Sequence, residues 1–173
     1  TSYRAERLPK MGETILGTSF VLGPGGKGSN QSVAAAMAGG GVHFISRLGR
    51  DDFADIAHAT WARAGVHPEI TEDLESYTGA ALIFIENATG NNAIIVANGA
   101  AGRVSAADVE ANADLIRGAA VFVTQLEQPI AAAKRGLEIA RAAGVTTILN
   151  PAPAATLDDD ILALCDYLTP NET

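Results

Sequence analysis

The chain has 173 residues, of which 47% are hydrophobic and 18% charged, so it is long enough to bury a core and does not have a disordered composition. Its formal net charge of -8, with no cluster of Lys or Arg, argues against a nucleic-acid partner, because a phosphate backbone would repel it. The single cysteine, Cys165, excludes an internal disulfide, and neither a secretion signal nor an apolar run of about 20 residues is visible, so we expect a cytoplasmic protein without a membrane anchor.

A glycine-rich stretch, Gly23 to Gln31 (GPGGKGSNQ), leads into an alanine-rich segment of helical character. Glycines permit positive φ and a close approach of the backbone to a ligand. Lys27 and Asn30 add donors at a helix N-terminus, where hydroxyls or anions bind. A tight turn that only caps the helix explains the glycines equally well.

The same stretch fails as either of two known phosphate-binding loops. It fits G-x-G-x-x-G, but the next predicted strand ends in Ser46 and Arg47 instead of the acidic residue of a dinucleotide site. It is not a P-loop, because Val21 stands at the first glycine and Gly28 at the Ser or Thr.

Short β-rich runs alternate with longer helical segments, which is typical of an α/β domain with a largely parallel sheet. We predict strands at 42–47, 119–124, 145–150 and 166–170, and helices at 52–64 and 130–143. Ser105 and Asp108 have the spacing of a capping box and predict a further helix that runs to about Arg117. Within the helix at 52–64, we expect Phe53 and Trp61 to lie in the core.

One segment interrupts the alternation with a predicted β-hairpin. Residues 79–86 and 92–97 are apolar runs joined by a turn-like stretch from Asn87 to Asn91. The hairpin is either an edge of the main sheet or a small second sheet that covers a site.

Polar residues follow three of the predicted strands. Gln125 and Glu127 follow the strand at 119–124, Asn150 follows the next, and Asn171 and Glu172 follow the last. Ligands of open α/β sheets bind beyond the carboxyl ends of the strands, so these residues mark a candidate site, although any one of them is equally well explained as an ordinary loop residue. The three histidines have no metal-ligand spacing among them or with the single cysteine, so we predict no metal site.

Several motifs, in this order along the chain, resemble those of the ribokinase-like (PfkB) carbohydrate kinases. The first signature of the family resembles Met11-Gly-Glu-Thr14, Gly25-Gly-Lys-Gly-Ser-Asn-Gln31 and Leu48-Gly-Arg-Asp-Asp52. The ribokinase branch of the family is similar at Thr78-Gly-Ala-Ala-Leu-Ile-Phe84, Gln125-Leu-Glu127, Asn150-Pro-Ala-Pro-Ala154 and Leu168-Thr-Pro-Asn-Glu-Thr173. The resemblance covers nearly the whole chain.

The resemblance implies a three-layer α/β/α fold with a largely parallel sheet, of which residues 1–173 form part of one domain. It also implies a small β-hairpin lid, with lid segments at about 8–24 and 76–100. The residues implied in the site are Gly25, Gly26, Lys27, Asn30 and Glu127 at the sugar, Ala93, Ile95 and Ala97 in the lid above it, and Asn171 near the nucleotide phosphates.

The activity implied is the ATP-dependent phosphorylation of D-ribose to D-ribose 5-phosphate, with Mg²⁺ as the partner of ATP and K⁺ as a further cation of the family. The family's first strand would precede Thr1, and its catalytic base, anion hole and nucleotide site would follow Thr173. We therefore expect no catalytic residue in this segment and no kinase activity from it alone.

The resemblance also implies a homodimer formed through the lid. Leu82, Phe84, Ile94 and Val96 would supply an apolar face for it, although their alternation fits cover of the site equally well. Three alternatives to a ribose kinase stay open: a kinase for another sugar or a nucleoside, a non-catalytic sugar-binding fragment, and a nicotinamide-dependent oxidoreductase, against which the missing acidic residue counts.

Overall fold

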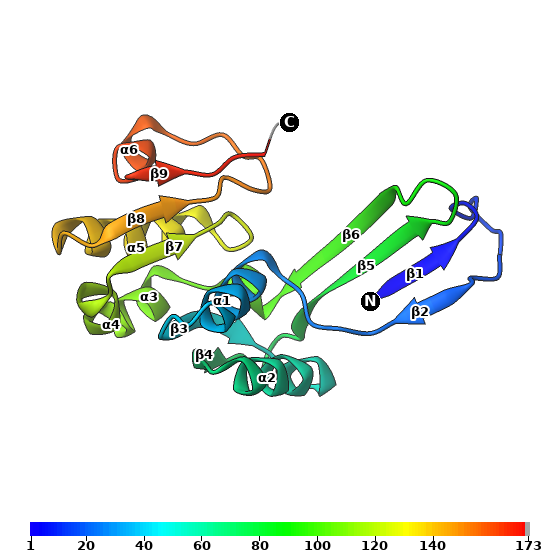
Figure 1. Cartoon of the computed structure of the whole chain (residues 1–173), viewed down its shortest axis with the longest axis horizontal. Coiled ribbons are helices and arrows are strands. Elements are labelled where there is room, and N and C mark those ends of the chain that lie inside the picture. The colour runs from blue at the N-terminus through cyan, green and yellow to red at the C-terminus, as the bar shows by residue number, and fades with distance from the viewer. Residues whose placement is uncertain (172–173) are drawn as a thin grey trace.

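The structure, a computed structural model, describes residues 1–171 and consists of two parts (Figure 1). Strands and helices alternate in the larger part, which we call the body. Four further strands form a separate sheet that projects from the body, and we call it the outer sheet.

Parallel strands form the centre of the body. β3 (Val42–Leu48) pairs with β4 (Val66–Glu72), and β7 (Val121–Thr124), β8 (Thr146–Leu149) and β9 (Tyr167–Leu168) pair in that order. No ladder joins β3 to β7 within residues 1–171. The predicted α/β class is confirmed, and the four predicted strands are present with ends that agree within two residues.

β4 is a strand that the sequence analysis missed. Its sequence contains Pro68, which cannot donate to a ladder and therefore weakens a strand prediction. In the described part of the chain β4 pairs only with β3, so Pro68 lies on an edge strand, where proline is tolerated.

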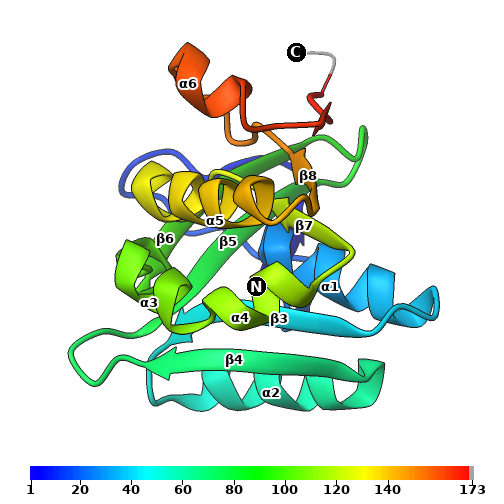
Figure 2. The same ribbon diagram turned by 90° about the vertical axis from the view of Figure 1, so that its left-hand side faces the viewer.

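Helices cover both faces of the body strands, as Figure 2 shows. α1 (Lys27–Met37) and α2 (Asp52–Ala64) pack on β3 and β4, whereas α3 (Ala106–Ala111), α4 (Ala113–Gly118) and α5 (Ile130–Ala142) pack together near β7 and β8. Phe44 and Ile45, adjacent in β3, enter different hydrophobic clusters. Successive side chains of a strand point to opposite faces, so the body has the three-layer arrangement. A short helix, α6 (Asp159–Leu162), precedes β9.

Two helix predictions need correction. The helix predicted from Ser105 to about Arg117 has its capping box, but it is interrupted at Asn112. The side-chain amide of Asn112 donates to the carbonyl of Asp108 at 2.9 Å, and such local bonds compete with the helical ladder.

The prediction that Phe53 lies in the core is wrong. Trp61 is 2% exposed, whereas Phe53 is 40% exposed. Eight residues at 3.6 per turn place two side chains about 80° apart around a helix, so one faces the core and the other its margin. Asp51 caps the start of α2, since its carboxylate accepts the N–H of Ala54 at 2.9 Å.

The outer sheet has the strand order β2-β1-β5-β6. β1 (Ser2–Ala5) pairs antiparallel with β2 (Ser19–Val21) and parallel with β5 (Thr78–Glu86), and β5 pairs antiparallel with β6 (Asn92–Gly99). The predicted hairpin is present, and it belongs to this second sheet and not to an edge of the body. β1 and β2 were not predicted from the sequence, because both strands are short.

The ladder register corrects the predicted apolar face of the hairpin. Leu82 pairs with Ile95, and Ile83 pairs with Ile94. Paired residues of an antiparallel ladder share a face, so Leu82 and Phe84 lie on one face of the outer sheet and Ile94 and Val96 on the other. A register shift of one residue exchanges the two faces, and the apolar pattern alone does not fix it because both faces are apolar here.

The outer sheet joins the body at a closely packed junction. The N–H of Gly49 donates to Thr78 Oγ1 at 3.0 Å, and the Asp51 carboxylate accepts the N–H of Thr78 at 2.8 Å. A Cβ on Gly49 would lie 2.5 Å from a backbone oxygen, so only glycine fits there. Burial disfavours the charged form of Asp51, but the N–H donors outweigh it and lower the pKa of this carboxyl group.

A network of ion pairs holds the same junction beside η1 (Ala100–Arg103), which follows β6. Arg47 donates two hydrogen bonds to Asp108, at 2.8 and 2.9 Å, and Arg103 lies 3.2 Å from Asp73. Burial opposes ionisation of Asp108, but hydrogen bonds from Arg47, Ser105 and a threonine outweigh it and hold its pKa well below the usual range.

Candidate functional site

A cavity of about 1310 Å³ lies between the outer sheet and the body. It is lined by the first turns of α1, by the loop after β7 and by the facing strands β3 and β7. The outer sheet contributes one face, which we call its inner face, through Ser2, Val21, Ala81, Ile83 and Val96. The cavity extends along β7, from residues 118–120 before its amino end to Gln125 and Glu127 after its carboxyl end. The candidate site is the part at the carboxyl end, where ligands of open α/β sheets bind.

The polar centre of the cavity is the contact between Glu127 and the start of α1. The backbone N–H of Lys27 donates to Glu127 Oε2 at 2.6 Å. Gly26 precedes the helix with a φ of 89°, which favours glycine, and a Cβ there would lie 3.9 Å from the same carboxylate oxygen. The positive end of the helix dipole favours an anion at this place, so the turn holds the carboxylate within the cavity.

The residues predicted to contact a sugar are brought together. Gly25, Gly26, Asn30 and Glu127 all line the cavity, and Lys27 lies between them in the chain with its backbone bonded to Glu127. A carboxylate, an amide and backbone N–H groups that lie close together can bind several hydroxyl groups of one small polar ligand.

The predicted lid residues do not all face the cavity. Ala97 lines it near the junction. Ala93 and Ile95 do not, because they pair with Phe84 and Leu82 on the opposite face of the outer sheet. The inner face carries instead Ala81, Ile83 and Val96. These residues were not predicted in the site, because the alternation of apolar residues does not determine the register between β5 and β6.

Two other predicted polar residues lie apart from this centre. Asn171 is exposed beyond β9 and does not line the cavity, and Glu172 is outside the described residues. Asn150 donates its side-chain N–H to the carbonyl of Thr169, so it ties the end of β8 to the end of β9. Its structure agrees with the ordinary loop role.

Beside Glu127 lie Gln31 and Gly28, which were not predicted as site residues, and Gln125, which was marked only among the polar residues that follow the strands. Gln125 is buried behind Glu127, and its side chain donates to Oε1 of Gln31 in α1. A Cβ on Gly28 would lie 3.0 Å from Oε1 of Gln125. The polar residues after the strand at 119–124 included Gln125. Its bond to Gln31 joins residues that are 94 positions apart in the chain, so no local sequence pattern predicts it.

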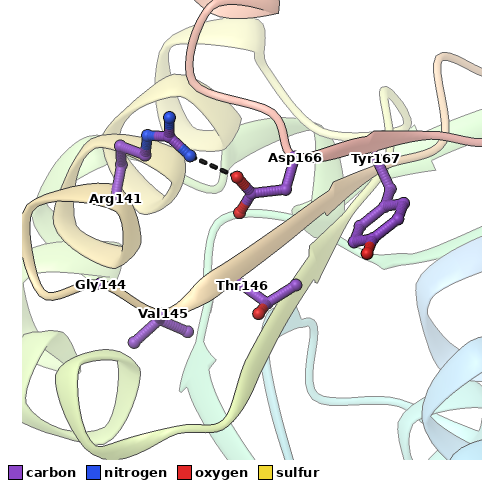
Figure 3. A pocket seen from close by; sticks show the side chains of 6 residues that line it. All are labelled: Arg141, Gly144, Val145, Thr146, Asp166 and Tyr167. Atoms are coloured by element: carbon purple, nitrogen blue, oxygen red, sulfur yellow. Dashed lines mark hydrogen bonds and ion pairs between the residues drawn. The ribbon is translucent and has the colours of Figure 1, made fainter.

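A second cavity, of about 590 Å³, opens at the amino ends of β8 and β9 (Figure 3). Its charged groups are paired, because the Asp166 carboxylate binds Arg141 and accepts the N–H of Thr147 at 2.9 Å. The bond from the Thr147 backbone lowers the pKa of Asp166. Since it lies at the opposite end of the strands from Glu127, we do not assign the site there.

The histidines make local contacts. His43 Nδ1 lies 3.0 Å from Glu69, and the rings of His43 and His67 stack at 5.1 Å. Over residues 1–171 no group of three or more His, Cys, Asp or Glu side chains has the arrangement of a metal site. Within the same residues, every helix is too short or too polar to cross a bilayer.

Comparison with known proteins relates the chain to one family. The sequence model described as pfkB family carbohydrate kinase matches residues 2–173. A ribokinase of Staphylococcus aureus is 40% identical over 170 residues, with 97% of this chain and 56% of the relative covered. A deoxyribokinase of Salmonella typhi is 34% identical over 169 residues, with 96% and 55% covered.

A solved structure shares the fold. The structure of Arabidopsis thaliana ribokinase complexed with ribose and ATP is 29% identical and superposes with a TM-score of 0.84, covering 99% of this chain and 56% of that one. The chain therefore spans about half the length of the curated relatives and of the solved structure that it matches.

Proposed function

The chain belongs to the pfkB family of carbohydrate kinases, and from this premise we propose that the protein containing it transfers the γ-phosphoryl group of ATP to the 5-hydroxyl of D-ribose. The observation that carries the proposal is the Glu127 carboxylate held at the first turn of α1, inside a cavity that the outer sheet covers. Relatives named ribokinase, one of them solved with ribose and ATP, support ribose as the sugar.

Sugar recognition would use the groups around this carboxylate. Glu127 accepts hydrogen bonds from two neighbouring hydroxyls, and the Lys27 ammonium and the Asn30 amide donate to others. Gly25 and Gly26 let the backbone approach the ring. Charge-assisted bonds of this kind are roughly twice as strong as neutral ones, so a small polyol can be bound in one orientation.

The outer sheet would act as a lid. Ala81, Ile83 and Val96 present apolar side chains to the cavity opposite Glu127. Apolar cover keeps water, a competing acceptor of the phosphoryl group, away from the bound sugar and strengthens its polar contacts. Ala97 would lie at the edge of this cover, whereas Ala93 and Ile95 would support it from the other face.

ATP, Mg²⁺ and K⁺ belong to the proposal through the family, and the described residues do not supply their sites. No cluster of acidic side chains among residues 1–171 fits Mg²⁺, and Asn171 is the one residue that we assign near the phosphates. We therefore derive no step through these groups. The chain taken alone would bind the sugar and would not phosphorylate it.

A homodimer through the outer sheet is part of the proposal. The face away from the cavity carries Tyr3, Phe20, Leu82 and Ile95, which are all at least 43% exposed. Apolar side chains on a sheet face favour a partner, and an isologous pairing of two outer sheets would cover them.

A kinase for a related sugar is the second candidate. The deoxyribokinase relative is 34% identical over nearly the whole chain, close to the identity of the ribokinases. The two sugars differ by one hydroxyl, and a site that hydrogen-bonds that hydroxyl rejects a substrate that lacks it.

The test is a turnover assay on the full-length protein that contains this chain. ADP formation is measured with D-ribose, 2-deoxy-D-ribose, D-fructose and adenosine in parallel. We expect ribose to give the highest kcat/KM. A preference for another sugar or for adenosine would overturn the ribose assignment, and absence of turnover with all four would overturn the kinase proposal.

A further inference from the structure

Gln125 occupies a buried position between the end of β7 and Glu127. It is 8% exposed, and its side-chain Nε2 donates to Oε1 of Gln31 in α1. Its backbone carbonyl accepts a bond from Gln128 Nε2 at 2.7 Å. A buried amide is stable only with such partners, so both its side chain and its backbone are fixed. Gln125 thus ties the loop that carries Glu127 to the helix that begins at Lys27.

Gly28 makes room for this amide. A Cβ on residue 28 would lie 3.0 Å from Oε1 of Gln125 and 3.0 Å from Cε2 of Phe44. Gly28 lies in the first turn of α1 and has no positive φ, so its conformation does not require glycine. The space beside this glycine is taken by the Gln125 amide and the Phe44 ring.

The two sides of this contact, α1 and the loop that carries Glu127, are each also bonded to another part of the body. The indole N–H of Trp61 in α2 donates to Ser29 Oγ at 2.9 Å, which fixes α1 to the body. The N–H of Leu126 donates to the carbonyl of Ala152 at 3.1 Å, which fixes the loop to the segment after β8. Neither of these bonds joins the loop to α1, so the Gln125–Gln31 bond makes that link beside the bond from Lys27 to Glu127.

We propose that Gln125 is a positioning residue of the sugar site, which sets the spacing between the Glu127 carboxylate and the first turn of α1. The proposal rests on the proposed function in one respect, the identity of the ligand as a sugar. A rigid ligand that binds both Glu127 and the residues at Lys27 requires their spacing to be right to a fraction of an ångström. Truncating Gln125 removes this support, and a methyl group on Gly28 disturbs it because the Gln125 amide must shift.

The test compares Gly28→Ala, Gln125→Ala and the double variant with the unmodified chain. We expect each single variant to weaken D-ribose binding about tenfold in calorimetry, and the double variant to be no weaker than the weaker single, because coupled sites are not additive. Gly118→Ala is the matched control, since Gly118 is also helical and an added Cβ there meets no atom within 4 Å. Gly118 lines the cavity only before the amino end of β7, at the opposite end of that strand from Glu127. The affinity of this variant for ribose stays unchanged.

A second readout does not depend on the sugar. Hydrogen exchange of the Lys27 amide, measured by NMR on the ligand-free chain, reports the bond to Glu127. We expect it to accelerate in Gly28→Ala and in Gln125→Ala, with unchanged exchange in the helices of the body. A global loss of stability would instead accelerate exchange everywhere.

The outcomes separate this proposal from the proposed function. Unchanged Lys27 exchange in both single variants, or ribose losses that add in the double variant, would overturn the positioning role. Faster Lys27 exchange in both variants, together with no ribose binding by the unmodified chain, would support the positioning role and overturn the sugar as ligand.

Discussion

The body and the outer sheet are stabilised in different ways. Within residues 1–171, the three clusters of buried apolar side chains lie in the body, around Val104, Trp61 and Leu137. In the outer sheet, every residue of β6 from Asn92 to Asn98 is exposed. The outer sheet thus depends on strand pairing and on its junction with the body. One of its faces lines the cavity, and the other is the face of the proposed homodimer.

The largest expected effect is the loss of a core side chain in the body. Leu137→Ala should lower the free energy of unfolding by about 3 kcal/mol, because Leu137 is fully buried in α5 and its truncation leaves a cavity. Ile95→Ala in the outer sheet should cost less than about 0.5 kcal/mol, since Ile95 is 70% exposed. Urea unfolding followed by circular dichroism compares the two variants, and equal losses would remove the distinction between the two regions.

The junction comes next. Asp108→Asn should lower the stability by about 2 kcal/mol, because it weakens the charge-assisted hydrogen bonds from Arg47 to a buried carboxylate, although Asp73 still lies 3.5 Å from Arg47. Asp114→Asn, in an exposed pair with Arg117, is the matched control and should cost less than about 1 kcal/mol.

The junction also predicts a pH dependence. The pKa of Asp108 is lowered in the folded chain, so its contribution to stability is complete above the ordinary pKa of aspartate, about 3.9, and is lost as the pH falls below it. The free energy of unfolding of the unmodified chain should therefore decrease below about pH 4 more steeply than that of Asp108→Asn. Parallel curves for the two proteins between pH 2 and about pH 5 would contradict the charged network.

An intermediate effect is expected where the body meets the ligand. Glu127→Ala should weaken D-ribose binding by about 1.5–3 kcal/mol, the contribution of a hydrogen bond to a charged group. The exposed Glu110 in α3 pairs with Arg135 and offers a control, since Glu110→Ala should leave the affinity unchanged. Calorimetric titration measures the D-ribose affinity of each variant. Equal affinities for the Glu127 variant and the unmodified chain would exclude this carboxylate from the site.

The smallest effect should distinguish the two faces of the outer sheet. Ile83→Ala should weaken ribose binding by about 1 kcal/mol, because Ile83 lines the cavity and covers the sugar with apolar surface. Ile95→Ala, on the other face, should leave ribose binding unchanged. If the Ile95 variant lost affinity and the Ile83 variant did not, the assigned inner face would be the wrong one.

The sequence was sufficient for the local features. The capping box at Ser105 and the hairpin around Asn87 each arise from a few adjacent residues, and both are present. The resemblance to the family motifs likewise assigned Glu127 and the glycines before α1 to one site, because those motifs can be recognised from adjacent residues of the chain.

Contacts between distant residues were beyond the sequence. The face of β6 that meets the cavity depends on a ladder register that two apolar faces leave undetermined, so Ile95 was selected where Val96 lines the cavity. The bond between Gln125 and Gln31 depends on how α1 packs beside β7. Phe53 was assigned to the core from its apolar character, although its position on α2 turns it away.

The central claim is that a sugar binds between the body and the outer sheet, and hydrogen–deuterium exchange with and without D-ribose tests it most directly. We predict that ribose protects amides in both regions, in the segment from Gly25 to Gln31, in the loop at Glu127 and in β5 around Ile83, whereas Glu127→Ala shows no protection at the same ribose concentration. Protection confined to the cavity at Arg141 and Asp166, or the absence of protection in the outer sheet while ribose is bound, would contradict the account.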